Sequence, residues 1–188
     1  MNETGMKKML KTYHQHVHER KVQGIPPLPL DPEQTHELTL LLEKPTKTTN
    51  KDFLLDLLKN RIPPGVDKAS YIKANWLNSI AQGKTLSPLI DPKEATRLLG
   101  TMMGGYNVAA LIELLKNRNE EIASIAAIGL SNTLLIYDAL NDILELSKTN
   151  HFAKQIIKSW ANAEWFTKRP KLPTEITVTV FKVDGETN

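Results

Sequence analysis

The chain has 188 residues, of which 40% are hydrophobic and 24% are charged, a balance typical of one globular domain. It contains no cysteine, which excludes disulfides, thiolate nucleophiles and cysteine-ligated zinc or iron–sulfur sites within these residues. The formal net charge of +3 is too small to indicate nucleic-acid binding by itself. No apolar stretch is long enough to cross a membrane and none follows the basic start, so we expect no membrane span, no secretory signal and a cytoplasmic location.

Short helices separated by proline and glycine breaks are predicted along most of the chain. The first covers residues 6–22, where apolar side chains recur at helical spacing, and the proline-rich residues 25–29 after it form an extended connector. At the next start, Asp31 occupies the cap position, Pro32 the first helical position and Gln34 the third. This arrangement predicts a helix that begins at residue 32.

The middle of the chain repeats these start and stop signals. Asn50 and Asp67 are cap residues that predict helices over residues 51–60 and from residue 68, and Gly83 suits the end of the second one. Asp91, followed by proline and with a glutamate at the third helical position, predicts another helix start. Asn107 is expected to open a helix that reaches residue 117.

The last predicted helices include one that should lie at the centre of the fold. Residues 120–130 are apolar on nearly every side, which is typical of a helix covered by its neighbours. A further helical run is expected over residues 132–146, as one helix or two, and a last helix over residues 152–166. The signals add up to about nine or ten short helices.

Two segments of the chain read alike. Residues 52–61 and 109–118 both end in Leu-Leu-Lys-Asn-Arg. A recurring helix of this kind predicts stacked helix pairs, as in an all-α superhelix of HEAT or armadillo type. Leu and Lys are common helix formers, so helix propensity alone is the alternative explanation for part of the likeness.

The character of the sequence changes after Trp165. Two prolines predict a linker over residues 169–174. Residues 176–180 then alternate β-branched apolar side chains with threonine, a period of two typical of a β-strand. No second strand of equal quality is predicted, and a lone strand leaves its backbone groups unpaired. We therefore expect the strand's partner in a downstream domain missing from this chain or in a sheet supplied by another chain. The turn chemistry of Asp184 and Gly185 favours the missing domain, to which residues 175–188 would belong; a frayed tail is the alternative.

Few groups are candidates for chemistry. His14 and His18 lie four residues apart on one helix face, where two imidazoles can bind zinc, but a tight site needs further ligands and we interpret them as surface histidines. The glycine-rich residues 100–105 lack the ending of a phosphate loop and follow a helix, which predicts a tight turn. Cap roles account for Asp91 and Glu94 without a paired-carboxylate site. We expect no catalytic, cofactor-binding or metal-binding residue in this chain.

Aromatic and basic residues gather near the end of the chain. The tryptophans are interpreted as core or domain-interface anchors, and stacking of Trp165 on a nucleobase is the alternative. A candidate basic patch follows them, although such clusters are usually solvated faces. Its members are Lys168, Arg169 and Lys171.

Several long motifs of this chain resemble the amino-terminal region of bacterial aconitase B. They are the residues Gly-Ile-Pro-Pro-Leu-Pro-Leu-Asp at 24–31 and the segments 53–67, 99–107, 159–166 and 176–188. The resemblance covers nearly the whole chain from about residue 9. Residues 1–8 look like an extension outside the pattern.

The resemblance carries several implications for fold and function. Aconitase B is a cytosolic hydro-lyase of the citric acid cycle that interconverts citrate and isocitrate, and some members act on 2-methylisocitrate. A [4Fe–4S] cluster held by three cysteines is its Lewis acid, and the cysteines and substrate-binding residues of the family lie beyond Asn188. The amino-terminal region is a HEAT-like domain that lies against the catalytic body, helps form a substrate passage, and is implicated in dimerisation and mRNA binding. It precedes a swivelling domain that starts with a β-strand.

We therefore expect four parts in this chain: an extension or disordered start at 1–8, a HEAT-like helical domain at 9–168, a linker at 169–174, and the truncated first strand of the swivelling domain at 175–188. The expected partners are the remaining domains of the same enzyme, a second copy in a homodimer, and mRNA. The alternative is a stand-alone RNA-binding regulatory module. The candidate interaction surface consists of Leu99, Met102, Tyr106, Trp160, Trp165 and Phe166.

Overall fold

The computed structural model describes residues 3–46, 50–65, 67–133, 136 and 139–162, and every regular element over these residues is an α-helix. The expected strand at 175–188, the linker at 169–174 and the end of the predicted last helix lie outside the described residues. The helices are α1 Glu3–Val22, α2 Pro32–Glu43, α3 Lys51–Asn60, α4 Lys68–Ala81, α5 Pro92–Gly100, α6 Tyr106–Leu114, α7 Glu120–Asn132, α8 Leu140–Leu146 and α9 His151–Ala161.

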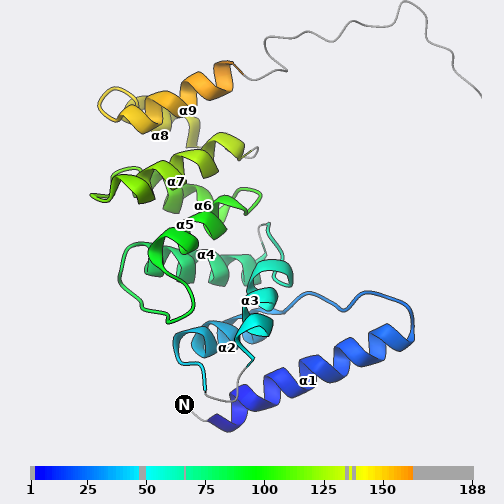
Figure 1. Cartoon of the computed structure of the whole chain (residues 1–188). Helices are drawn as coiled ribbons and strands as arrows, with labels where there is room; N and C mark the ends of the chain where they lie inside the picture. Colours follow the sequence, from blue (N-terminus) through cyan, green and yellow to red (C-terminus); the bar gives the residue numbers. More distant parts are fainter. Residues whose placement is uncertain (1–2, 47–49, 66, 134–135, 137–138, 163–188) are drawn as a thin grey trace, which may run out of the picture.

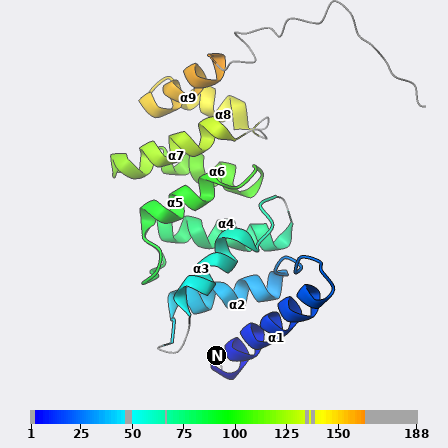
Figure 2. The same ribbon diagram turned by 45° about the vertical axis from the view of Figure 1, so that its right-hand side comes forward.

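The helices stack in two layers from α2 to α9, with α1 lying across one end of the stack (Figures 1 and 2). In one layer α2 packs on α4 and α4 on α6; in the other, α5 packs on α7 and α7 on α9. Successive pairs, such as α4 with α5 and α6 with α7, join the layers. The structure thus confirms the predicted all-α class and has the form of a solenoid; the finer HEAT assignment stays a prediction.

Most helix starts follow the cap residues seen in the sequence. At α2 the Asp31 carboxylate accepts a hydrogen bond from the Gln34 amide at 2.8 Å, and the Gln34 side chain accepts one from the Asp31 amide, which completes a capping box. Asn50, Asp67 and Asp91 cap α3, α4 and α5 through their side chains. These predictions are confirmed because a cap involves groups only two or three residues apart.

Asn107 is not the cap that the sequence suggested. Gly105 is the N-cap, so α6 begins two residues earlier than an Asn107 cap would allow, and it ends at Leu114, short of the predicted residue 117. Gly104 and Gly105 have φ values of 116° and 79°. The side chain of Asn107 is fully buried and its Nδ2 donates to the carbonyl of Leu99 at 2.9 Å. The asparagine therefore closes the α5–α6 turn from inside, and the two glycines supply the backbone conformation that other residues disfavour.

The predicted helical run at 132–146 does not begin a helix at residue 132, although a helix does reach residue 146 as expected. α7 continues to Asn132, where Thr133 takes an extended conformation and its hydroxyl donates to the carbonyl of Gly129 at 2.9 Å. Ile136 is not helical, and α8 begins only at Leu140. The run therefore contributes the end of one helix and a separate short one.

Two glycines let α5 and α7 approach closely. A Cβ atom added to Gly129 would lie 2.8 Å from Gly100 Cα, and one added to Gly100 would lie 3.0 Å from Gly129 Cα. Such distances leave no room for a side chain on either helix, so backbone packs on backbone at the centre of the stack.

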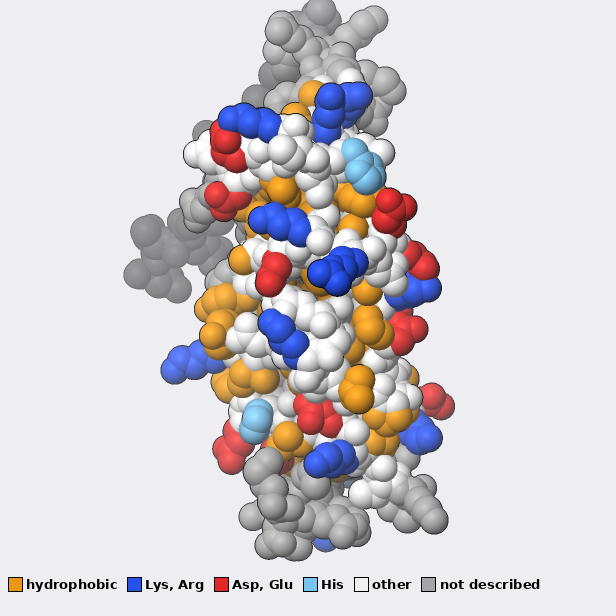
Figure 3. Space-filling view, turned by 90° about the vertical axis from the view of Figure 1, so that its left-hand side faces the viewer, with side chains coloured by type: hydrophobic (Ala, Val, Ile, Leu, Met, Phe, Trp, Pro, Cys, Tyr) orange, Lys and Arg blue, Asp and Glu red, His pale blue; other side chains and the backbone are white. Residues whose placement is uncertain are grey.

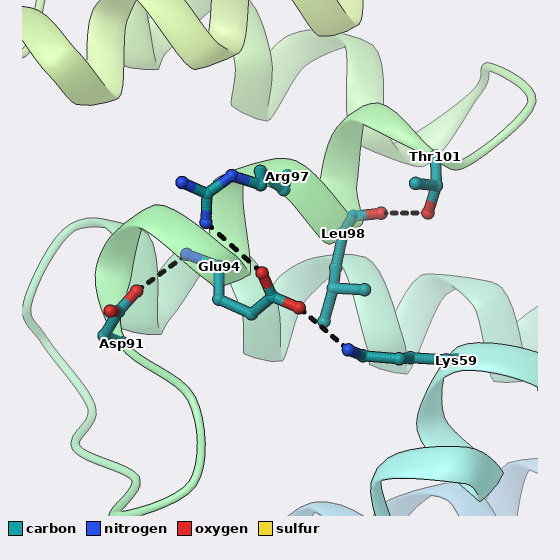
Figure 4. A network of polar contacts seen from close by, with 6 residues as sticks. All are labelled: Lys59, Asp91, Glu94, Arg97, Leu98 and Thr101. Carbon is teal, nitrogen blue, oxygen red and sulfur yellow. Dashed lines mark hydrogen bonds and ion pairs between the residues drawn. The ribbon is translucent and has the colours of Figure 1, made fainter.

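Polar contacts brace the same layer from outside. Lys59 of α3 pairs with Glu94 of α5 at 2.9 Å, and Arg97 approaches the other oxygen of Glu94 (Figure 4). Lys93 continues the series by pairing with Glu121 of α7. The bond from Lys59 and the attraction of both cations hold the pKa of Glu94 below its usual value, although burial opposes this.

Candidate interaction surface

The stack has two long edges formed by the turns between helices. α1, α3, α5 and α9 end at the same edge, as both ribbon views show (Figures 1 and 2). We call it the exit edge; it includes residues 23–31, 61–65, 101–105 and the end of α9. The opposite edge carries the turns after α4, α6 and α8, at residues 82–91, 115–119 and 147–150.

Three apolar side chains stand exposed together at the exit edge. Met103, in the α5–α6 turn, is 60% exposed, Tyr71 in the first turn of α4 is 51% exposed, and Tyr106 at the start of α6 is 41% exposed. The rings of Tyr71 and Tyr106 meet edge to face with centroids 5.0 Å apart. We call these residues the tyrosine–methionine patch. Exposed aromatic and methionine side chains are the kind enriched in protein interfaces.

The backbone beneath the patch is firmly held. The amide of Met103 donates to the carbonyl of Pro64 at 3.1 Å, which ties the α5–α6 turn to the α3–α4 turn. In the latter turn the hydroxyl of Ser70 lies 2.6 Å from the carbonyl of Pro63 and 2.7 Å from the carboxylate of Asp67. Burial would raise the pKa of Asp67, but hydrogen bonds from Ser70 and from the amide of Ala69 outweigh it and lower the pKa. The patch is thus presented on a rigid base.

The opposite edge carries charged side chains with apolar side chains between them (Figure 3). Space-filling representation shows lysine, arginine, aspartate and glutamate side chains distributed along its length (Figure 3). The exposed basic residues of its turns are Lys84, Lys116, Arg118 and Lys148. The large exposed apolar residue in these turns is Leu86.

The residues predicted as an interaction surface have different surroundings. Tyr106 is exposed, whereas Leu99 and Met102 are buried in the core. Trp160 is half-buried and its Nε1 donates to the carbonyl of Ser131 at 3.2 Å. Trp165 and Phe166 lie outside the described residues, as do the basic residues Lys168, Arg169 and Lys171. The predicted surface as a whole stays a prediction.

The sequence analysis missed Tyr71 and Met103. Both belong to segments that were interpreted for other reasons, Tyr71 as part of the apolar stripe of a helix and Met103 as part of a tight turn. The pattern of α4 carries a usable signal, because Tyr71 lies about 180° around the helix from Ile80, which belongs to the apolar stripe. A helical projection would therefore have placed Tyr71 on the outer side.

Lys73 is the most unusual ionisable residue in the described part of the chain. Its side chain is 2% exposed and makes no hydrogen bond or ion pair with another described residue. Burial lowers its pKa from 10.5 to about 8, because a low-dielectric surrounding disfavours the ammonium form. Its side chain is buried, whereas Tyr71 of the patch lies on the other face of the same helix.

No metal centre is formed by the described residues, since none of their histidine, aspartate and glutamate side chains gather in groups of three or more that could hold an ion. His14 stacks on the ring of Phe53 with centroids 4.4 Å apart, which accounts for one of the two histidines considered above. None of the described helices combines the length and apolar character needed to cross a membrane.

Comparison with known proteins assigns this helical stack to a family. The family model described as the aconitate B N-terminal domain matches residues 12–166. The chain belongs to this family. It is 55% identical over 180 residues to aconitate hydratase B of Synechocystis sp., covering 96% of this chain and 21% of that protein. Over 181 residues it is 52% identical to aconitate hydratase B of Escherichia coli, again covering 96% of this chain and 21% of the relative.

The chain spans about a fifth of the length of these aconitate hydratase B relatives. The family match covers α2 to α9 and most of α1. The aconitate B N-terminal domain is therefore the whole described stack, and the tyrosine–methionine patch and Lys73 both lie inside the matched residues.

Proposed function

We propose that this chain is a non-catalytic N-terminal domain of an aconitate hydratase B, and that its role is to contact the rest of that enzyme. The full-length enzyme would isomerise citrate and isocitrate in the cytoplasm. Support comes from the identity of more than half of the aligned residues to named relatives over nearly the whole chain. The observation that carries the contact role is the group of exposed apolar side chains on the rigid exit edge.

The cofactor of the proposed enzyme does not fit this chain. A [4Fe–4S] cluster is ordinarily held by cysteine thiolates, and the chain has no cysteine. The cluster ligands and the substrate-binding residues would therefore lie in the other four-fifths of the enzyme. This chain would contribute docking to the catalytic body, one wall of a substrate passage, and a dimer contact.

A chimeric enzyme tests the proposal. The chain replaces the corresponding N-terminal part of the Escherichia coli relative, and hydration of cis-aconitate is measured for the chimera, the isolated chain and the remaining part of the relative alone, each after treatment with iron and sulfide. We expect turnover by the chimera and none by the isolated chain. Turnover by the isolated chain would contradict a non-catalytic role.

The same preparation tests the RNA-binding alternative. If the isolated chain were a nucleic-acid module, it would bind RNA at low salt and lose affinity steeply as salt rises, because phosphate contacts release counterions. We expect no such binding by the described stack, whose charged edge carries acidic as well as basic residues (Figure 3).

A further inference from the structure

We infer that the connection between α1 and α2 is a pH-sensitive strap, which is closed while the side chain of His16 is neutral and loosens when that side chain gains a proton. We call residues 25–30 the proline strap; they lead from the end of α1 back to the start of α2 (Figure 1). The strap is held by residues of the described stack alone, so the inference goes beyond the contact role proposed above and does not depend on it.

The amide groups of the proline strap are all bonded. Proline at positions 26, 27 and 29 leaves three amides that can donate. Two of them, from Ile25 and Leu30, donate to backbone carbonyls at the ends of α1 and α3, at 3.1 and 2.7 Å. The third, from Leu28, donates to Nε2 of His16 at 2.9 Å. The imidazole is therefore the one titratable group among the three acceptors.

The carbonyl groups of the strap are held by side chains that keep their protons. Those of residues 26–27 accept hydrogen bonds from the guanidinium groups of Arg20 and Arg61, at 2.9 Å each. The carbonyl of Leu28 accepts one from Tyr13 Oη at 3.3 Å. Arginine stays charged at every pH that a folded protein meets, so these bonds do not respond to mild acid. The response is left to the bond at His16.

Only a neutral imidazole can accept the bond from the Leu28 amide. Because Nε2 accepts, it carries no proton, and the proton of the neutral ring lies on Nδ1. An imidazolium has a proton on both nitrogens and no acceptor left. Histidine is the side chain whose ordinary change of charge falls between about pH 5 and 8. In mild acid the Leu28 amide would therefore face a second donor, and this bond of the strap is lost.

The charges brought to the strap oppose an imidazolium there. Arg20 lies one turn after His16 on α1, and Arg61 follows the end of α3; both donate to the strap. Glu19, also one turn after His16, accepts from Gln15 at 2.8 Å. The ring of Tyr13 lies with its centroid 6.1 Å from that of His16. The ionisable residues of α2, which packs on α1, are Glu33, His36, Glu37 and Glu43.

Opening of the strap would loosen the second half of α1. This helix lies across one end of the stack (Figures 1 and 2). Tyr13, which is 2% exposed, is bonded both to the strap and to Arg61 at the end of α3. The strap thus links α1 to the end of α3, and mild acid should weaken this link while the packing from α2 to α9 persists.

Nuclear magnetic resonance of the full 188-residue chain tests the inference. Imidazole nitrogen spectra at pH 8 should show that Nε2 of His16 is unprotonated. Amide exchange is measured at pH 8 and pH 5 and expressed as protection factors, which correct for the effect of pH on exchange itself. We expect the protection factor of Leu28 to fall by about two- to twelvefold at pH 5, the range that corresponds to one hydrogen bond. The control is Leu54, whose amide donates to the carbonyl of Asn50 and should be unaffected.

The matched variant is His16→Gln, because glutamine places an acceptor oxygen close to the position of Nε2 and does not titrate. It should remove the dependence of Leu28 protection on pH. His14→Gln and His18→Gln are controls on the same helix, the first at the ring that stacks on Phe53 and the second at an exposed position. Both should keep the dependence. The measurements on the unchanged chain decide the question if His16→Gln does not fold.

Several outcomes would overturn the inference. A proton on Nε2 of His16 at pH 8 would show that the imidazole does not accept the bond. Equal protection of Leu28 at pH 8 and pH 5 would show that the strap ignores acid. A dependence that persists in His16→Gln, or that disappears in His14→Gln, would assign the effect to another group. An equal loss of protection at Leu54 would indicate general unfolding in acid and no separate strap.

Discussion

The middle of the stack and its N-terminal end are held together in different ways. Where α5 crosses α7, two glycines bring the helix backbones into direct contact. Where α1 meets α2, hydrogen bonds hold the connection between the two helices. Arg61, at the end of α3, donates to Tyr13 Oη at 3.0 Å and to the carbonyl of Pro27 at 2.9 Å. Arg20 of α1 donates to the carbonyl of Pro26 at 2.9 Å. The amide of Leu28 donates to Nε2 of His16 at 2.9 Å.

The difference teaches where the domain tolerates change. A backbone-to-backbone crossing has no adjustable group, so added volume must move a whole helix. A connection held by hydrogen bonds loses only the bonds that a substitution removes. Substitutions should therefore lower the stability of the domain more in the middle of the stack than at its N-terminal end.

The largest effect is expected for Gly129→Ala. Alanine normally stabilises a helix relative to glycine by about 0.5–1 kcal/mol, but its Cβ would lie 2.8 Å from Gly100 Cα. We expect the free energy of unfolding to fall by about 3 kcal/mol or more, measured by urea denaturation. Gly65→Ala is the control, because an added Cβ there meets nothing within 4 Å. Equal stability of the two variants would disprove the tight crossing.

Lys73→Met, in the middle of the stack, should raise the free energy of unfolding. Below pH 8 the lysine is charged in the folded and the unfolded chain, and the folded state bears the cost of burying the charge. Between pH 8 and 10.5 the unfolded chain keeps a proton that the folded chain has released, because the folded pKa is lowered from 10.5 to about 8. Stability therefore rises with pH in this range, by about 3 kcal/mol at about 1.4 kcal/mol per pKa unit.

The methionine variant should remove that dependence on pH. We expect Lys73→Met to raise the free energy of unfolding at pH 7 by between about 2 and 3 kcal/mol, since methionine fills a similar space without a charge. Lys116→Met, at an exposed position, is the matched control and should change little. A destabilised Lys73→Met variant would show that the ammonium group has a favourable partner.

A smaller loss is expected for Arg61→Ala at the N-terminal end. The variant loses two charge-assisted hydrogen bonds to Tyr13 and Pro27, and we expect a loss of about 2 kcal/mol in urea denaturation. The Leu28 amide should also exchange faster with solvent. Arg97→Ala, which removes an arginine from the surface of α5, should cost much less. If both arginines prove equally unimportant, hydrogen bonds do not hold this end.

The smallest effect is expected for Glu94→Gln, which breaks the pairs with Lys59 and Arg97. These groups are partly exposed, so we expect a loss of no more than about 0.5 kcal/mol at pH 7. Because its bond from Lys59 holds the pKa of Glu94 below the ordinary value, this contribution is present above the ordinary pKa and disappears as pH falls through the lowered one. A loss of several kcal/mol would contradict this prediction and show that surface ion pairs contribute strongly to the stability of the stack.

The repeated segments show how far sequence reasoning reaches. Residues 52–60 lie in α3, whereas the second segment is helical only over 109–114, and most of its shared Leu-Leu-Lys-Asn-Arg ending lies in the turn after α6. They are not equivalent in the stack, however, because α3 is the second helix of its pair and α6 is the first of another. The likeness of the two segments indicates a similar spacing of apolar side chains. The layer in which each helix lies depends on the connections before and after it.

The sequence alone determined the helical class, the capped starts at Asp31, Asn50, Asp67 and Asp91, and the resemblance to aconitase B, because caps and apolar periodicity act over a few neighbouring residues. Tertiary structure decided the rest. The crossing at Gly100 and Gly129, the burial of Lys73 and the meeting of Tyr71 with Tyr106 depend on residues that come together only when separate helices pack. No local pattern encodes which side of a turn faces solvent, since that is fixed by the neighbours on the stack.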